Sequence, residues 1–183
     1  VSVSRLVLLD STVLVDAVGS SPGARHASQH IFSAVLEGRL EALISIESIQ
    51  ETFTVVARRR GDRKTALKFA WQIVDTFRIA EVDNKLLKLA LDLLEDRDQI
   101  MGADAIVLAT AIESRAAHLV TRDKGLGAAA GSLWVDPSDS AALARLIPGA
   151  TLTVLDMGHL LPDALAAPVG AQVAAFIRAE TAG

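Results

Sequence analysis

The sequence of 183 residues contains no cysteine and no tyrosine. Without cysteine, the chain can form no disulfide bond and offers neither a thiolate metal ligand nor a thiol nucleophile. Without tyrosine, and with aromatic residues at 4% of the chain, it has no aromatic strand platform on which nucleic-acid bases could stack. The absence of cysteine also fits a reducing compartment.

Excess positive charge and long apolar runs are missing as well. The formal net charge is −4, so no bulk attraction to nucleic acid or to an anionic membrane is expected. No apolar run approaches the roughly 18 residues that a membrane-spanning helix needs, and the apolar stretch 6–9 is too short for the core of a signal peptide. We therefore expect a cytoplasmic protein without a membrane partner. A nucleic-acid enzyme of this charge would need a local basic patch or a bridging metal ion.

Short apolar segments alternate with amphipathic segments along most of the chain. The runs RLVLL, ALIS, HLVT and SLWV predict buried strands, and FRIAEV predicts a further strand. Helical spacing of the apolar residues predicts helices at about 12–17, 24–37, 47–60, 63–76, 83–96 and 103–114. Strands that alternate with helices indicate right-handed βαβ units around a mostly parallel sheet, which is an α/β fold.

The character of the sequence changes near Val135. The last part has its own candidate strand (TLTVL), a loop (DMGHLLPD) and an amphipathic helix at about 169–179. We therefore divide the chain into a first domain, 1–136, and a C-terminal βα extension, 137–183.

Four acidic residues stand at the edges of apolar runs: Asp10, Glu51, Asp104 and Asp123. Asp10 and Asp123 follow predicted strands, so both are expected where the carboxyl ends of parallel strands form a crevice. Asp104 is expected in the first turn of its helix, and Glu51 on the helix after the second strand. Four carboxylates at one end of a sheet repel each other unless a cation holds them. The pattern therefore predicts a Mg²⁺ or Mn²⁺ site, whose chemistry would be phosphodiester hydrolysis.

Each of these residues also has a purely structural interpretation. An aspartate at a strand end or a helix start commonly caps a helix or lies in a solvated loop. Ser11 and Thr12 could likewise be simple helix caps. The joint placement of the four carboxylates at one end of the sheet is what favours the metal site.

Three segments resemble the motifs of PIN-domain nucleases. They are DSTVL after the first strand, SIESIQE, and GADAIVLATAIESRAAHLVTRDKGL, which is similar to the D-A-x-x-x-A-x-A block and the L-V-T-x-D motif of that family. The resemblance covers about 6–136 and implies a three-layer α/β/α domain. It also implies that the metal-binding carboxylates are Asp10, Glu51, Asp104 and Asp123.

Two further polar residues are expected to serve the site, the first of them by the resemblance. Thr121 matches the polar residue that supports the site, and Ser11 would help to orient ligands or water. Thr12 departs from the motif, because many members carry asparagine there. Its hydroxyl can still form hydrogen bonds within the site.

Compact single-domain members of this family are often VapC-like toxins of toxin–antitoxin pairs. Such proteins cleave RNA with Mg²⁺ or Mn²⁺, form homodimers and are silenced by a cognate antitoxin. The resemblance thus implies a ribonuclease toxin with an RNA substrate, an antitoxin partner and a homodimeric state. The alternative is a catalytically silent module with the same fold that acts by protein association.

One basic cluster stands out, formed by Arg58, Arg59, Arg60, Arg63 and Lys64. It could bind RNA phosphates without sequence preference. It could equally be a solvated helix end, where cations suit the helix dipole, and we favour this second interpretation.

The tail, in contrast, resembles the closing part of an α/β-hydrolase, with Asp136 and His159 as two members of a catalytic triad. A G-x-S-x-G sequence at 19–23 places Ser21 in the nucleophile position. A nucleophile elbow, however, needs a strand that leads directly into its turn, and here the predicted helical stretch at about 12–17 intervenes. A serine hydrolase is therefore the less favoured alternative.

Overall fold

The computed structural model describes residues 6–19, 22–137, 139, 142, 145 and 146. The chain divides into two compact units, 1–152 and 153–183, and every described residue belongs to the first. The strand and helix predicted for the C-terminal extension lie outside the described residues. The same holds for Ser21 and His159, so the serine hydrolase alternative stays a prediction.

Strands alternate with helices as the sequence predicts. The strands are β1 (Leu6–Leu9), β2 (Glu41–Ile44), β3 (Arg78–Ile79), β4 (His118–Val120) and β5 (Trp134–Val135). The helices are α1 (Ser11–Ala17), α2 (Pro22–Leu36), α3 (Ile46–Arg60), α4 (Arg63–Thr76), α5 (Asn84–Asp96), α6 (Gly102–Glu113) and α7 (Lys124–Ala130). The strands form one sheet in the order β3-β2-β1-β4-β5, and every pairing is parallel.

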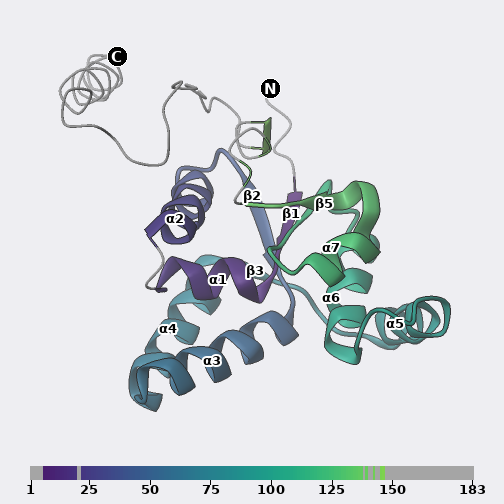
Figure 1. Cartoon of the computed structure of the whole chain (residues 1–183), viewed down its shortest axis with the longest axis horizontal. Coiled ribbons are helices and arrows are strands. Elements are labelled where there is room, and N and C mark those ends of the chain that lie inside the picture. The colour runs from purple at the N-terminus through teal and green to yellow at the C-terminus, as the bar shows by residue number, and fades with distance from the viewer. Residues whose placement is uncertain (1–5, 20–21, 138, 140–141, 143–144, 147–183) are drawn as a thin grey trace. The chain divides into compact units, whose positions relative to one another are not determined.

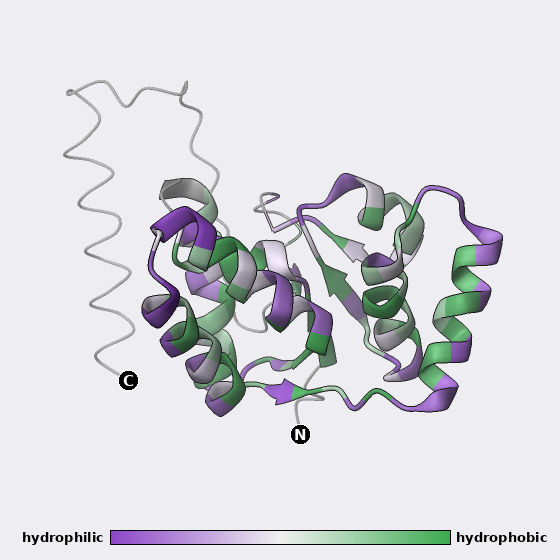
Figure 2. Cartoon of the chain, turned by 90° about the horizontal axis from the view of Figure 1, so that it is seen from below, coloured by the Kyte–Doolittle hydropathy of each residue, from purple (hydrophilic) through white to green (hydrophobic). Residues whose placement is uncertain are grey.

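The sheet lies between two layers of helices, which confirms the three-layer α/β/α fold. Helices α1 to α4 cover one face of the sheet, and α5 to α7 cover the other (Figure 1). Successive side chains of β1 enter different cores: Leu8 packs with α5, α6 and α7, whereas Val7 and Leu9 pack with α1, α2 and α4. Burial on both faces explains why this strand reads as a continuous apolar run. The helices carry both apolar and polar residues, as Figure 2 shows.

The helix α7 was not predicted from the sequence. Its segment, KGLGAAA, contains two glycines, which disfavour helix in isolation. The helix begins where the Asp123 carboxylate accepts a hydrogen bond from Leu126 N at 2.9 Å. Gly127 leaves space for the Trp134 ring, since a Cβ atom there would lie 2.3 Å from Trp134 Cε2. Tertiary packing therefore overrides the weak local propensity of this segment.

The core continues beyond the predicted domain boundary at residue 136. Leu146 is only 2% exposed and belongs to the same core cluster as Val7 and Leu9. The boundary itself stays a prediction, because most of 137–183 lies outside the described residues. Among the described helices, none is both long and apolar enough to cross a membrane.

Candidate active site

The candidate site lies at the carboxyl ends of the two central strands. Asp10 directly follows β1, and Thr121 directly follows β4. Because Leu9 pairs with Val120, these two polar residues emerge side by side, and Asp10 N donates to Val120 O at 3.1 Å. Asp10 is 4% exposed and Thr121 is fully buried. Parallel strand register thus brings together residues that are 111 positions apart.

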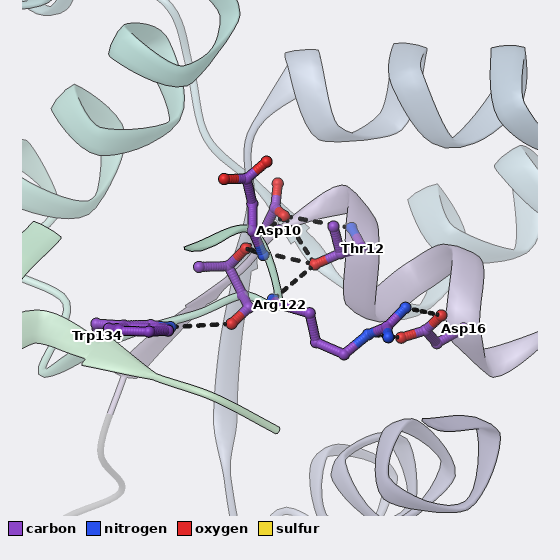
Figure 3. Close-up of polar contacts among 7 residues, drawn as sticks. Asp10, Thr12, Asp16, Arg122 and Trp134 are labelled. Atoms are coloured by element: carbon purple, nitrogen blue, oxygen red, sulfur yellow. Dashed lines mark hydrogen bonds and ion pairs between the residues drawn. The ribbon is translucent and has the colours of Figure 1, made fainter. Parts of the chain in front are cut away.

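The Asp10 carboxylate is fixed by neighbouring hydroxyl and amide groups. Its Oδ2 atom accepts hydrogen bonds from Thr121 Oγ1 at 2.8 Å, from Thr12 Oγ1 at 2.9 Å and from Thr12 N at 3.3 Å (Figure 3). These hydrogen bonds all reach the same oxygen, so Oδ1 is the oxygen that can be offered to a ligand. The bond to Thr12 N also makes Asp10 the N-cap of α1. The structural and functional interpretations of Asp10 are therefore compatible.

The Thr12 hydroxyl forms hydrogen bonds both to Asp10 and to the loop after β4. Besides its bond to Asp10, Thr12 Oγ1 accepts a hydrogen bond from Arg122 N at 3.0 Å. Thr121 Oγ1 similarly accepts from Asp123 N at 2.9 Å. The departure from asparagine at this position thus leaves a connected polar network between α1 and the loop after β4.

Asp104 lies near the charges of Asp10 and Asp123. It stands in the first turn of α6, where its Oδ2 accepts from Met101 N at 3.3 Å. Burial raises the pKa of Asp104 above its ordinary value, the Met101 hydrogen bond lowers it, and the negative charges of Asp123 and Asp10 raise it further. Asp104 therefore senses the charges of two of the other three predicted carboxylates.

The fourth predicted carboxylate, Glu51, approaches from α3. Its side chain is exposed, and its Oε2 accepts a hydrogen bond from Ser11 Oγ at 2.8 Å. Ser11 itself is 3% exposed, at the start of α1. The structure thus pairs Glu51 with Ser11, the residue that follows Asp10 in the sequence, and no hydrogen bond among those of the described residues joins Glu51 to the other three carboxylates.

The donor set fits a hard divalent cation, although the carboxylates are not gathered tightly. In the described part of the chain, no group of three or more histidine, aspartate or glutamate residues forms a ready-made metal site. Carboxylate oxygens are nevertheless the ligands that Mg²⁺ and Mn²⁺ prefer. Burial and, to a lesser extent, the negative charges of Asp123 and Asp10 raise the pKa of Asp104, and a bound cation would offset both penalties on its ionised form. The residues therefore fit such an ion.

Two neighbours of the site were missed by sequence reasoning. Asp16 is a buried acid on α1 and forms an ion pair with Arg122. Trp134 donates from Nε1 to Thr121 O at 3.0 Å, which supports the segment behind Thr121 (Figure 3). One signal was available for Asp16, because an acid within the apolar helix run VLVDA needs a partner when buried.

The basic cluster belongs to the end of one helix and the start of the next. Its members are exposed, and α3 ends at Gly61, whose φ of 63° is the left-handed conformation that glycine tolerates. Arg60 Nη2 donates to Val18 O at 2.8 Å, a carbonyl at the C-terminal end of α1. This contact supports the interpretation of the cluster as a helix end.

Comparisons with known proteins identify the family of this chain. Residues 6–125 match the family model described as PIN domain. Ribonuclease VapC7 of Mycobacterium tuberculosis (strain ATCC 25618 / H37Rv) is 29% identical over 144 residues, which cover 78% of this chain and 98% of that protein.

Solved structures share the fold at lower sequence identity. The M. tuberculosis toxin VapC20, described as cleaving the sarcin-ricin loop, aligns with a TM-score of 0.57 at 16% identity, over 67% of this chain and 94% of that one. FitAcB from Neisseria gonorrhoeae aligns with a TM-score of 0.56 at 22% identity, over 72% and 97% of the two chains. Since the family model spans well over half of the sequence and includes all four carboxylates, this chain belongs to the PIN domain family.

Proposed function

We propose that this protein is a divalent-metal-dependent endoribonuclease and the toxin of a toxin–antitoxin pair. The observation that carries the proposal is the buried Asp10 carboxylate, fixed by Thr12 and Thr121 beside the charges of Asp104 and Asp123. Membership of the PIN domain family and the similarity to a protein named as a ribonuclease support the same activity.

In this proposal Asp10, Asp104 and Asp123 hold Mg²⁺ or Mn²⁺, and Glu51 assists. A divalent cation bound there offsets charge on a phosphoryl group and lowers the pKa of a water molecule. Thr121 and Thr12 hold the Asp10 carboxylate through its Oδ2 atom, so the carboxylate that would help to hold the cation is already oriented.

Ser11 acts through its contact with Glu51. Its hydroxyl donates to Glu51 Oε2 at 2.8 Å and so orients a carboxylate that would otherwise sample many rotamers in solvent. The Glu51 carboxylate would then contact water or the RNA backbone from one defined position.

The proposal extends to protein partners. One structural neighbour is described as a toxin–antitoxin complex from Klebsiella pneumoniae, which suits an antitoxin partner for this chain. Exposed apolar residues supply candidate surfaces for a second copy or an antitoxin: Leu67, Trp71 and Val74 on α4, and Leu87 and Leu91 on α5. Trp71 is 65% exposed and so is no core residue, whereas Phe69 packs against the core. A homodimer and a cytoplasmic location stay predictions.

The test is RNA cleavage by the purified protein with Mn²⁺ or Mg²⁺. Asp10→Asn keeps a helix-capping side chain but removes the charge, so we expect cleavage to fall by about 100-fold or more with little loss of stability. EDTA should have the same effect. As a matched control, Asp92→Asn changes an exposed aspartate on α5 and should cleave normally. Cleavage that persists in EDTA or in Asp10→Asn would contradict the proposal.

The second candidate function is a catalytically silent binding module. The absence of a ready-made metal site among the described residues is the observation that favours it. Titration with Mn²⁺ separates the two, because a ligand that binds only the folded state raises the melting temperature with concentration. An unchanged melting temperature at millimolar Mn²⁺ would favour the silent module.

A further inference from the structure

An ion pair joins the loop after β4 to the helix α1. Arg122 Nη2 donates to Asp16 Oδ1 at 2.6 Å, and Arg122 Nε forms an ion pair with Asp16 Oδ2, an oxygen that accepts no hydrogen bond among the described residues (Figure 3). The Asp16 side chain is 7% exposed and the Arg122 side chain is 41% exposed. Two-point contact between a guanidinium and a carboxylate fixes orientation as well as distance.

The same helix also holds the backbone of Arg122. Thr12 Oγ1 accepts a hydrogen bond from Arg122 N at 3.0 Å, and Thr12 lies one helical turn before Asp16 on α1. Arg122 is therefore held at its amide and at its guanidinium by one face of a single helix. Since the guanidinium is turned to Asp16, it is already occupied by a carboxylate rather than free for an RNA phosphate.

This attachment matters because Arg122 stands between two residues of the proposed site. Asp123 is exposed, and its described hydrogen bonds stay within its own loop and helix: Oδ1 accepts from Leu126 N, and its amide donates to Thr121 Oγ1. The placement of its carboxylate relative to Asp10 therefore depends on the backbone of the loop. That backbone is tied to α1, the helix that Asp10 caps.

We propose that Asp16 is a positioning residue that acts through Arg122 to hold Asp123 beside Asp10, and thereby sets the affinity of the site for a divalent cation. This inference rests on the proposed function. Replacing a residue that orients a metal ligand without binding the metal itself commonly changes metal affinity or activity by about 10- to 100-fold.

The experiment compares single variants with a double variant. Arg122→Met and Asp16→Asn should each raise the dissociation constant for Mn²⁺ by about tenfold and slow single-turnover RNA cleavage by about as much. Arg122→Met also leaves a buried carboxylate without its partner, which should lower the melting temperature. Adding Asp16→Leu removes that stranded charge, so the double variant should regain stability without regaining Mn²⁺ affinity. Recovery of fold without recovery of binding is what distinguishes positioning from a merely structural ion pair.

As a matched control, a different ion pair is broken at the C-terminal end of α6, away from Asp104. Lys85 Nζ lies 2.6 Å from Glu113 Oε1, and Glu113 ends α6, whereas Asp104 lies in the first turn of that helix. Lys85→Met should therefore leave Mn²⁺ affinity and cleavage at wild-type values. If Arg122→Met fails to fold, Arg122→Lys keeps the charge but loses the two-point contact, and it should show the same loss of affinity.

Three outcomes would overturn the inference. The first is wild-type Mn²⁺ affinity and cleavage in the double variant, which would leave the pair a structural role alone. The second is a raised KM with unchanged kcat and unchanged Mn²⁺ affinity in Arg122→Met, which would make Arg122 an RNA contact. The third is wild-type protein that neither binds Mn²⁺ nor cleaves RNA, which would overturn the proposed function as well. The third outcome thus contradicts both proposals, whereas the first two contradict the positioning inference alone.

Discussion

The carboxylates at the strand ends fall into two groups that differ in how they are held. Asp10 is buried and receives hydrogen bonds from side chains and backbone of two different segments. Asp104 and Asp123 instead accept bonds only locally among those described, from Met101 N and Leu126 N, at the starts of their own helices. One group is fixed before any ligand binds, and the other can adjust.

This difference follows from the cost of bringing like charges together. A buried carboxylate needs donors, and Thr12 and Thr121 provide them to Asp10. The remaining carboxylates stay in solvent or at half burial, where water screens their repulsion. The site thus consists of one fixed ligand and several adjustable ones, and a cation would draw the second group toward the first.

Removing a hydrogen-bond donor to Asp10, the fixed carboxylate, should cause the largest loss of stability. Thr121→Val keeps the shape of the side chain but leaves buried Asp10 Oδ2 without one donor, so we expect a loss of about 1–3 kcal/mol in unfolding free energy. Cleavage should fall by about 10- to 100-fold. Thr65→Val is the matched control, since Thr65 donates to Asp62 on the exposed start of α4. Urea unfolding that shows equal losses for the two variants would contradict the distinction.

The next largest loss of stability should come from disturbing the contact between Gly127 and the Trp134 ring. In Gly127→Ala, the new Cβ would lie 2.3 Å from Cε2 of Trp134, whose indole bonds to the carbonyl of Thr121. We expect a destabilisation of about 1–3 kcal/mol from overpacking. Gly102→Ala is the control, because a Cβ there meets nothing within 4 Å, and it should be neutral or stabilising. Thermal unfolding of the two variants checks this, and a stable Gly127→Ala protein would contradict it.

Glu51 belongs to neither group, because it is exposed but accepts a hydrogen bond from another helix, and loss of that one contact should matter less. Ser11→Ala removes the hydroxyl that donates to the exposed Glu51, so the expected cost is about 0.5–1.5 kcal/mol. Cleavage should slow by only a few-fold, since the other three carboxylates are unchanged. A loss of activity as large as that of Asp10→Asn would place Glu51 and Ser11 in the fixed group instead.

The smallest effect concerns Asp104 in metal-free protein. Folding raises the pKa of Asp104 above 3.8, so between pH 3.8 and the raised value the folded state binds more protons than the unfolded state. Stability therefore falls as pH rises through this window. Asp104→Asn removes this cost, and at neutral pH its melting temperature should rise by about 1 °C, a small gain because solvent screens a half-buried carboxylate.

The gain should vanish below pH 3.8, where the wild-type carboxyl is also protonated in both states. Asparagine keeps an oxygen for the Met101 amide, so the capping contact is preserved. Melting curves against pH in EDTA provide the measurement. A lower melting temperature for Asp104→Asn at neutral pH would contradict the claim that burial and neighbouring charges penalise the ionised Asp104 carboxylate.

The sequence predicted the fold well where local pattern and tertiary structure agree. The apolar runs became β1, β2, β4 and β5, and the helix predicted at about 83–96 became α5, with Asp83 as its N-cap. The helix α7 could not be predicted, because it depends on the Trp134 ring packing against Gly127. Such packing involves residues whose proximity is decided by the strand order rather than by local spacing.

The positions of the acidic residues at the ends of the elements could be predicted from the sequence, but their hydrogen-bond and ion-pair partners could not. That Asp10 ends a strand can be read from the pattern, but its bond to Thr121 depends on the pairing of Leu9 with Val120. The partner of Asp16 is 106 residues away, and no periodicity identifies it. Burial of an acid predicts that a partner exists, whereas only the fold determines which one.

Equilibrium Mn²⁺ binding, measured by calorimetry on wild-type protein, Asp10→Asn and Asp92→Asn, tests most directly whether Asp10 holds a cation. We predict saturable binding by the wild type, binding weakened by about 100-fold or more in Asp10→Asn, and unchanged binding in Asp92→Asn. Equal Mn²⁺ affinity in wild-type protein and Asp10→Asn would contradict the claim that the fixed carboxylate at the end of β1 holds a divalent cation.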